Sequence, residues 1–272
     1  MQARLRHVAI VTRNPPQLAE FYRQLFGMTG NPSGEGGAAS SIDGYVWLAV
    51  NTRPRGRQGG LDHFGIEVDD VAAVEAIRAR VHDDYPSVEI ARRTNRGFAA
   101  FSMHDPAGNV FDLSPVDMHD DTRLYANLSE DRRHPRRISH IYLRTVDPTG
   151  VAQFYQDVFE LRDQPKTPGD PNHYLTDGTM TLVVAPWHIT DYTGSGIERP
   201  ALDHIGFEVE SIEAFESDLQ RLAASNPALA PLPIKSGGEG DTRMKLLATT
   251  CKYGTYHLSD PDGVLLDVSE HR

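Results

Sequence analysis

Two sets of side chains in this sequence have the composition of a metal-binding site. The first set is His7, His63 and Asp112, and the second is His140, His204 and Asp267. Each His begins an apolar segment, and each Asp lies in a final apolar segment that follows a tight turn. Two imidazoles and one carboxylate on one side of a metal leave the opposite coordination positions open. This donor set suits Fe(II), Mn(II) or a related ion that binds substrate and oxygen together.

The two sets fall at equivalent positions of an internal repeat that covers nearly the whole chain. Three pairs of segments match, and the difference in residue number between them grows along the chain. Residues 7–26 match 140–159 with an offset of 133, residues 61–68 match 202–209 with an offset of 141, and residues 105–114 match 260–269 with an offset of 155. The second half therefore carries insertions, and we expect the largest to be a loop near residues 231–241, which are rich in Pro and Gly.

The elements that position these residues also repeat. Each half begins with a strand and a helix, continues through a hairpin turn to a second strand and helix, and ends with strands after an Asp-Pro-x-Gly turn. In the first half these are a strand over 7–12, a helix over 16–26 that stops at Gly27, the turn Asp43-Gly44, a strand over 63–68 and a helix over 71–81. The pattern predicts an α+β fold of four βαβββ modules.

We expect the modules to pair into two domains, each with a curved mixed sheet that forms a cup. The first domain covers 1–116, with modules at about 5–50 and 61–115, and the second covers 138–272, with modules at about 138–186 and 202–270. Alternate side chains of a strand share a face, so two His and one Asp can converge inside each cup. The polar segment 117–137 is expected to be a linker, and its arginine pairs at 132–133 and 136–137 a solvated face.

Composition restricts the class of protein. The net charge is −11 without a long basic run, so nucleic acid and anionic membranes are poor partners. No apolar segment approaches the roughly 20 residues of a membrane span, and the N-terminus does not have a secretory pattern, so we expect a cytoplasmic protein. Cys251 is the single cysteine, which excludes an intrachain disulfide; we interpret it as a structural or incidental thiol.

A histidine at the start of a strand is often a hydrogen-bonded structural residue, and an aspartate after a turn can cap it. The same triplet at matched positions of both halves favours metal ligands. Gene duplication alone also preserves such a pattern, so the first-half set, His7, His63 and Asp112, is either a working site or a vestige.

At these residues the sequence resembles the vicinal-oxygen-chelate superfamily, which includes glyoxalases, bleomycin and fosfomycin resistance proteins and extradiol ring-cleaving dioxygenases. The four modules and both Asp-Pro-x-Gly endings carry the resemblance. Two tandem domains of two modules each look like the one-chain extradiol dioxygenases, which hold Fe(II) or Mn(II) with two His and one Glu in the C-terminal domain. The resemblance implies His140, His204 and Asp267 as ligands, with Asp in place of the family's Glu.

The resemblance also indicates where catalytic groups should lie. Met180 stands where these dioxygenases place an acid–base His, and His257 stands where they place a Tyr, ten residues before the ligand carboxylate. His257 is therefore either the acid–base group or a turn-capping residue. Tyr142 and Arg144 share strand parity with His140 and are expected in the cup, where they can orient an anionic or phenolic oxygen, unless Arg144 pairs with Glu208.

Three functions follow from the resemblance. The first is an extradiol-type dioxygenase that acts on a small catechol-like molecule, or another vicinal-oxygen chelator, with O2. The second is a non-redox metalloenzyme, such as an isomerase, epimerase or transferase of the glyoxalase or fosfomycin-resistance kind. The third is a protein that sequesters a drug or metabolite. A homo-oligomer is expected in each case.

Overall fold

The computed structural model describes residues 3–30, 39–92, 100–116, 135–234 and 237–271. The first half contains β1 (Arg4–Thr12), α1 (Pro15–Phe26), β2 (Ala39–Ile42), β3 (Trp47–Thr52), β4 (Gly60–Val68), α2 (Val71–Asp84), β5 (Ile90–Arg92), β6 (Phe101–His104) and β7 (Val110–Pro115). The second contains β8 (Arg137–Thr145), α4 (Pro148–Phe159), β9 (Arg162–Asp163), β10 (His173–Thr176), β11 (Thr181–Pro186), α5 (Ile189–Ser195), β12 (Ala201–Val209), α6 (Ile212–Ser225), η3 (Pro227–Leu229), α7 (Gly238–Thr250), β13 (Tyr256–Ser259) and β14 (Leu265–Glu270).

Each half builds one mixed sheet, as the repeat predicted, and the described residues form seven strands in each, where two βαβββ modules would give eight. The strand orders are β2-β3-β1-β4-β7-β6-β5 and β13-β14-β12-β8-β11-β10-β9. In both sheets the first strands of the two modules pair antiparallel at the centre, and each also pairs with the parallel last strand of its own module. This arrangement confirms the α+β class and places the first strand of each module between the last strand of its own module and the first strand of the other.

The first helix of each half is set by its flanking residues. The Asn14 side chain accepts from the backbone of Gln17, Pro15 fixes the first turn, and Gly27 ends α1 in the left-handed conformation at φ 66°. In α4 the cap is Asp147, and the left-handed end is Glu160 at φ 57°. Both helices therefore start and stop where the repeat predicted, within one residue.

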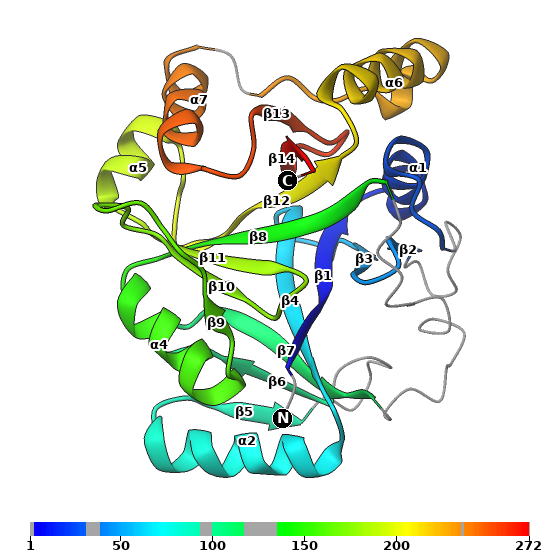
Figure 1. Cartoon of the computed structure of the whole chain (residues 1–272). Coiled ribbons are helices and arrows are strands. Elements are labelled where there is room, and N and C mark those ends of the chain that lie inside the picture. Colours follow the sequence, from blue (N-terminus) through cyan, green and yellow to red (C-terminus); the bar gives the residue numbers. More distant parts are fainter. Residues whose placement is uncertain (1–2, 31–38, 93–99, 117–134, 235–236, 272) are drawn as a thin grey trace.

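Helices of the two halves pack against each other. Helix α1 of the first half contacts α6 and η3 of the second, whereas α4 of the second half contacts α2 of the first (Figure 1). Phe26 of α1 stacks on Phe207 of β12 with ring centroids 3.8 Å apart, and both rings are buried. One hydrophobic cluster contains residues from both halves, so the halves share a core.

Hydrogen bonds between the halves come in two pairs that the repeat relates. In each bond, an aspartate of a turn in one half accepts a hydrogen bond from a residue of the other half. This role also explains why the turn aspartates occur in both copies of the repeat. The bonds are Tyr22 Oη to Asp260 Oδ2 at 2.9 Å, Tyr155 Oη to Asp105 Oδ2 at 3.4 Å, Leu5 N to Asp177 Oδ2 at 2.6 Å and Ile138 N to Asp43 Oδ2 at 2.7 Å.

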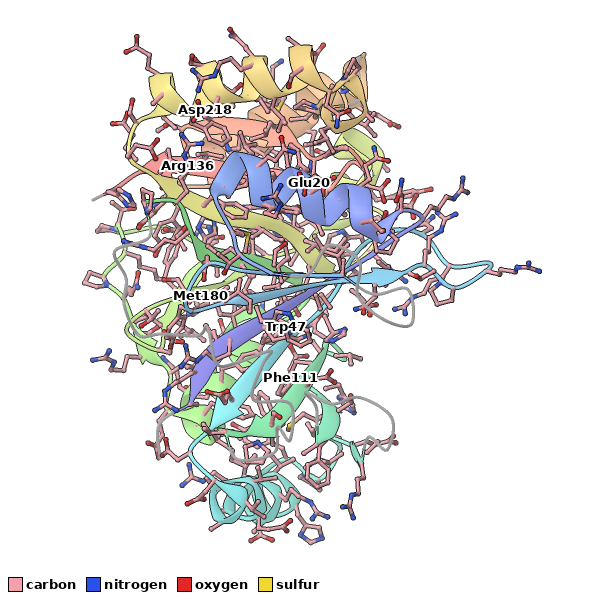
Figure 2. The ribbon with its side chains drawn as sticks, turned by 90° about the vertical axis from the view of Figure 1, so that its right-hand side faces the viewer. Glu20, Trp47, Phe111, Arg136, Met180 and Asp218 are labelled. Carbon is pink, nitrogen blue, oxygen red and sulfur yellow. The ribbon has the colours of Figure 1, made fainter. Side chains whose placement is uncertain are left out.

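Arg136, one of the linker arginines that we expected on a solvated face, is buried. Arg136 is only 7% exposed and binds both Glu210 and Asp218, in each case with a shortest distance of 2.5 Å (Figure 2). Its remaining nitrogen donates to the Leu25 carbonyl at 2.6 Å. This prediction was wrong because tertiary contacts bury Arg136 against the first half. The rest of the predicted linker, residues 117–134, lies outside the described residues.

Both insertions of the second half contain a helix. The interval between its two histidines is eight residues longer than in the first half and contains α5, and the interval from His204 to Asp267 is 14 residues longer and contains α7. The predicted loop at 231–241 is thus partly helical, since α7 begins at Gly238. The two inserted helices pack against each other at one side of the second sheet (Figure 1). Among the described residues, no helix is long and apolar enough to cross a membrane.

Candidate metal centres

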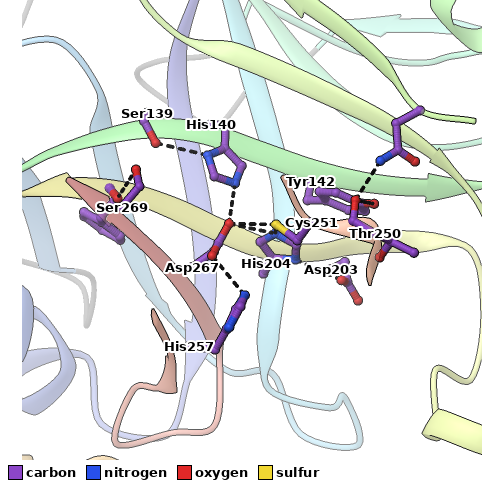
Figure 3. A network of polar contacts seen from close by, with 12 residues as sticks. Ser139, His140, Tyr142, Asp203, His204, Thr250, Cys251, His257, Asp267 and Ser269 are labelled. Atoms are coloured by element: carbon purple, nitrogen blue, oxygen red, sulfur yellow. Dashed lines mark hydrogen bonds and ion pairs between the residues drawn. The ribbon is translucent and has the colours of Figure 1, made fainter. Parts of the chain in front are cut away.

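The second sheet brings His140, His204 and Asp267 together from three adjacent strands, β8, β12 and β14 (Figure 3). His140 Nε2 lies 3.2 Å from Asp267 Oδ2, and His204 Nε2 lies 3.9 Å from the same oxygen. All three side chains are at most 1% exposed. The repeat and strand parity therefore predicted a set of residues that does converge on one point.

Two glycines allow this close approach. A Cβ on Gly206, which pairs with His140 across the strands, would lie 1.8 Å from the His140 ring. A Cβ on Gly254 would lie 1.3 Å from the Asp267 carboxylate. Only glycine fits where a backbone lies this close to a side chain. The Asp-His-x-Gly motif thus supplies both a candidate ligand, His204, and the surface on which the other imidazole rests.

Two further polar side chains reach this cluster. His257 of β13 pairs with Asp267 and places its Nε2 3.1 Å from Asp267 Oδ1. Cys251, the residue that follows α7, donates from Sγ to Asp267 Oδ2 at 2.7 Å and lies 3.4 Å from His204 Nε2 (Figure 3). Burial raises the pKa of the Cys251 thiol well above its usual range, and the neighbouring Asp267 carboxylate adds to the shift. Cys251, which the sequence predicted to be a structural or incidental thiol, thus lies inside the cluster.

The second histidine of the cluster is held from behind. Asp203 Oδ2 lies 2.9 Å from His204 Nδ1, so His204 is oriented with Nε2 toward the cluster. Arg144 pairs with the same aspartate at 3.3 Å, and Arg243 of α7 donates to its other oxygen. Burial raises the pKa of Asp203, but the two guanidinium groups outweigh it and keep that pKa well below its usual range. The alternative partner of Arg144, Glu208, instead pairs with Arg137.

The protonation states favour a cation. Burial lowers the pKa of His204, which leaves its ring neutral and able to ligate. Burial raises the pKa of Asp267, but the rings of His140 and His257 outweigh it and lower that pKa well below its usual range. Three buried atoms of the cluster make no hydrogen bond of good geometry: His140 Nε2, His257 Nε2 and Asp267 Oδ1. His140 Nε2 lies 3.2 Å from Asp267 Oδ2, and His257 Nε2 lies 3.1 Å from Asp267 Oδ1. Buried polar atoms that gather at one point with poorly directed hydrogen bonds fit a divalent ion.

The first sheet builds the equivalent cluster from β1, β4 and β7. His7 Nε2 lies 3.2 Å from His63 Nε2, which lies 3.1 Å from Asp112 Oδ2. His63 Nδ1 contacts Asp62 at 2.9 Å, and Ser102 donates to Asp112. Burial lowers the pKa of His63, but Asp112 and Asp62 outweigh it and raise that pKa. Burial raises the pKa of Asp112, but His63 is the main cause of a net decrease to about 2.

The two clusters differ in what surrounds them. In the described residues, the potential metal-binding groups are His7, His63 and Asp112 in the first half, and His140, His204, Cys251 and Asp267 in the second. Trp47 covers His7 with ring centroids 4.8 Å apart, and the cup beside them is lined by Ala9, Ile42 and Ala49. In the second half, Tyr142 stacks on His204 at 4.4 Å and Tyr253 lies 4.8 Å from His140.

Three other predicted positions can be placed. Tyr142 does share the cup face with His140, and its hydroxyl donates to the Thr250 carbonyl at 3.4 Å. Arg144 lies behind His204 against Asp203 rather than at the cluster itself. Met180 is 1% exposed in the shared hydrophobic core and does not face the cup, so its assignment to the acid–base position was wrong.

Cys251 was the residue that sequence reasoning missed. It lies near the end of the 14-residue lengthening of the second half, and the first half contains no cysteine to match it. Its place in the site depends on α7 folding back across the sheet, which no local pattern predicts. The available signal was the insertion itself, because insertions into a repeat often carry function.

One cavity reaches the first cluster, and another reaches Asp203 behind the second. One of about 530 Å³ is lined by His63, Asp62, Arg57 and Arg199 among others, and thus reaches the first cluster from the junction of the halves. Another of about 480 Å³ lies between the halves beside Asp203 and Arg243 of the second. Both have a volume that suits a small molecule.

Comparisons with known proteins agree with this fold. A family model described as a glyoxalase-like domain matches residues 7–114, which contain the first cluster and less than half of the chain. No curated protein sequence matches. Solved structures match over nearly the full length, and the Mn(II)-bound glyoxalase from Novosphingobium aromaticivorans is 15% identical at a TM-score of 0.65, covering 98% of this chain and 83% of its own.

Two dioxygenase structures match equally well. The 2,3-dioxygenase LapB from Pseudomonas sp. KL28 is 15% identical at a TM-score of 0.63, over 98% of this chain and 92% of its own. The 2,2',3-trihydroxybiphenyl 1,2-dioxygenase from Sphingomonas wittichii strain RW1 is 15% identical at a TM-score of 0.63, over 100% and 91%. The chain has the vicinal-oxygen-chelate fold. Its two-sheet architecture is similar to that of the two dioxygenase structures. At 15% identity this likeness concerns the fold alone.

Proposed function

We propose that this vicinal-oxygen-chelate protein is a metal-dependent enzyme of the extradiol dioxygenase type. It would hold Fe(II), or Mn(II) in second place, with His140, His204 and Asp267, and act on a small catechol-like molecule with O2. The observation that carries this proposal is the convergence of these three buried side chains on one point. Such a metal supplies Lewis acidity and a template that orients the substrate oxygens.

The polar surroundings favour the second half as the working one. There Asp203, Arg144 and Tyr142 hold His204 in position, by an ion pair and by stacking. The first-half cluster has alanines at the positions of Tyr142 and Val183, beneath Trp47. We propose that the first-half set, His7, His63 and Asp112, is a second metal site or a vestige of one.

His257 is the proposed acid–base residue. Its Nε2 is 3.1 Å from Asp267 Oδ1, and its side chain is 8% exposed. A proton held on Nε2 is therefore at the edge of the cluster, where it can be passed to a substrate oxygen. Arg144 and Tyr142 are proposed as positioning residues, because the structure places them against Asp203 and His204.

A non-redox metalloenzyme is the second candidate. The Mn(II)-bound glyoxalase matches with a TM-score of 0.65, as well as the dioxygenases do. Cys251 also lies beside Asp267 and His204, where it would leave less room for O2 at a metal. An isomerase, epimerase or transferase requires metal and substrate at the centre but no O2.

Three further expectations belong to the proposal. The chain would consist of domains at 1–116 and 138–272, with modules as predicted, joined by the segment 117–137. It would work in the cytoplasm, and it would assemble as a homo-oligomer. Sedimentation of the purified protein tests the last of these.

The first experiment measures metal and oxygen uptake together. Protein purified without oxygen or chelators is analysed by elemental mass spectrometry, and catechols are screened for O2 consumption. We expect about one or two Fe per chain and catechol-dependent O2 uptake, both reduced by His204→Ala. His63→Ala, at the matched position of the first half, is the control and should leave O2 uptake intact.

Other outcomes separate the alternatives. Bound Mn, Zn or Ni with no O2 uptake would contradict the dioxygenase and favour the non-redox enzyme. Protein that takes up no metal even after reconstitution would overturn the ligand assignment and favour a protein that sequesters a drug or metabolite.

A further inference from the structure

We propose that Cys251 is a fourth protein ligand of the second-half metal, so that this centre is a two-His, one-Cys, one-Asp site. This inference rests on the proposed metal binding by His140, His204 and Asp267 and adds a residue that neither the repeat nor the fold predicts. It makes the two centres of the chain chemically different.

The position of the sulfur supports this role. Sγ lies 2.7 Å from Asp267 Oδ2 and 3.4 Å from His204 Nε2, and the candidate ligand atoms of all four residues lie within 4.8 Å of one another. Zinc–sulfur and zinc–nitrogen bonds are about 2.3 Å and 2.0–2.1 Å long, so ligand atoms around one tetrahedral ion are separated by roughly 3–4 Å. The 3.4 Å between Sγ and His204 Nε2 falls in this range, whereas the 2.7 Å between Sγ and Asp267 Oδ2 would have to lengthen to admit an ion between them.

The other atoms of the cluster are an independent indication. His140 Nε2 and Asp267 Oδ1 are fully or almost fully buried and make no hydrogen bond of good geometry. With a structural thiol, these atoms would keep only the poorly directed contacts of 3.2 Å between His140 Nε2 and Asp267 Oδ2 and 3.1 Å between Asp267 Oδ1 and His257 Nε2, which is costly for buried groups. An ion held by all four side chains satisfies the imidazole and the carboxylate together.

The surrounding backbone fixes Cys251 in this place. Helix α7 ends at Thr250, and the backbone of Gly254 lies so close to Asp267 that a Cβ there would overlap its carboxylate. Arg243 of the same helix is bound to Asp203, the aspartate behind His204. The inserted segment is therefore anchored to the cluster at both ends, with the cysteine between the two anchors.

A thiolate ligand changes which metal is favoured and what the metal can bind. Soft sulfur donors favour Zn(II), Co(II) or Fe(II) over Mn(II). Binding releases the thiol proton to solvent, and the thiolate forms the bond to the metal. Four protein ligands would leave the ion fewer positions for substrate and O2 than three, which would favour chemistry that needs no O2.

Cobalt substitution tests the inference in the full-length protein. The His63→Ala chain, which lacks a first-half histidine ligand, is reconstituted with Co(II), and its near-ultraviolet spectrum is recorded with the metal content. We expect one Co(II) per chain with a sulfur-to-cobalt charge-transfer band. Cys251→Ser in this background should lose the band. It should also lose more Zn(II) affinity than the roughly 10–100-fold that removal of an outer partner costs.

The chain provides its own control. In the His204→Ala chain, cobalt bound by the first half must show no sulfur band, because Cys251 is the single cysteine. A second measurement needs no Cys251 variant. The rate at which iodoacetamide alkylates the thiol is measured in the His63→Ala chain, and Zn(II) should lower this rate. One bound Co(II) without the band, together with alkylation that Zn(II) does not affect, would overturn the role of Cys251 and leave the three-ligand site standing. If the chain bound no Co(II), both the role of Cys251 and the three-ligand site would be overturned.

Discussion

Replacement of Gly206 by alanine should disable the second metal centre. The added Cβ would lie 1.8 Å from His140 Cε1 and 1.9 Å from Nδ1, whereas ordinary contact begins at 3.4 Å. The ring and the strand must therefore separate by about 1.6 Å in a close-packed interior. Metal–ligand distances tolerate only about 0.2 Å. His140 is 1% exposed, so its ring cannot turn outward into solvent.

The expected effect is large for the metal and moderate for the fold. Overpacking of this kind destabilises by roughly 1–3 kcal/mol. Loss of one of three or four ligands should reduce affinity beyond the roughly 100-fold that outer-partner changes cause. The assay is metal content and titration in the His63→Ala background, where the ion belongs to the second half, with circular dichroism and thermal melting to confirm folding.

The equivalent substitution in the first half is the matched control. At Gly65 the added Cβ would lie 2.9 Å from His7 Cβ, a much smaller overlap, so Gly65→Ala should weaken the first-half centre much less. A folded Gly206→Ala chain that binds second-half metal with wild-type affinity would refute the argument that this glycine sets the position of His140.

Three other changes test the core, the buried charges and the inserted helix. Burial raises the pKa of Asp260 from 3.8 to about 6, so the stability that its protonated form contributes is lost as pH rises through 6. Relative to wild type, Asp260→Asn should therefore gain up to about 3 kcal/mol of unfolding free energy between pH 4 and 7. Urea unfolding across this pH range measures the difference, and a constant difference would contradict the prediction. Phe26→Ala removes the stack on Phe207 and should cost about 3–5 kcal/mol in one cooperative transition; separate unfolding of the halves would argue against a shared core. Arg243→Gln breaks the ion pair with Asp203 and should reduce second-half metal affinity about 10–100-fold by titration, whereas an unchanged affinity would mean that the anchor is dispensable.

Sequence alone determined the repeat, the class of fold and the two candidate ligand triplets. These features are encoded locally: a strand places alternate side chains on one face, and caps and turns such as Asn14, Gly27 and Asp43-Gly44 define the ends of elements. Because the two halves share this code, each histidine and aspartate could be assigned by its counterpart.

Tertiary structure decided the surroundings of those ligands. The contact of Arg144 with Asp203 across neighbouring strands, the burial of Arg136 against the first half and the placement of Met180 in the shared core depend on how distant segments pack in the folded chain. Cys251 reaches the cluster only because an insertion without a counterpart in the repeat folds back across the sheet. Contacts between distant segments are set by shape and burial in the assembled core, and local periodicity carries no information about them.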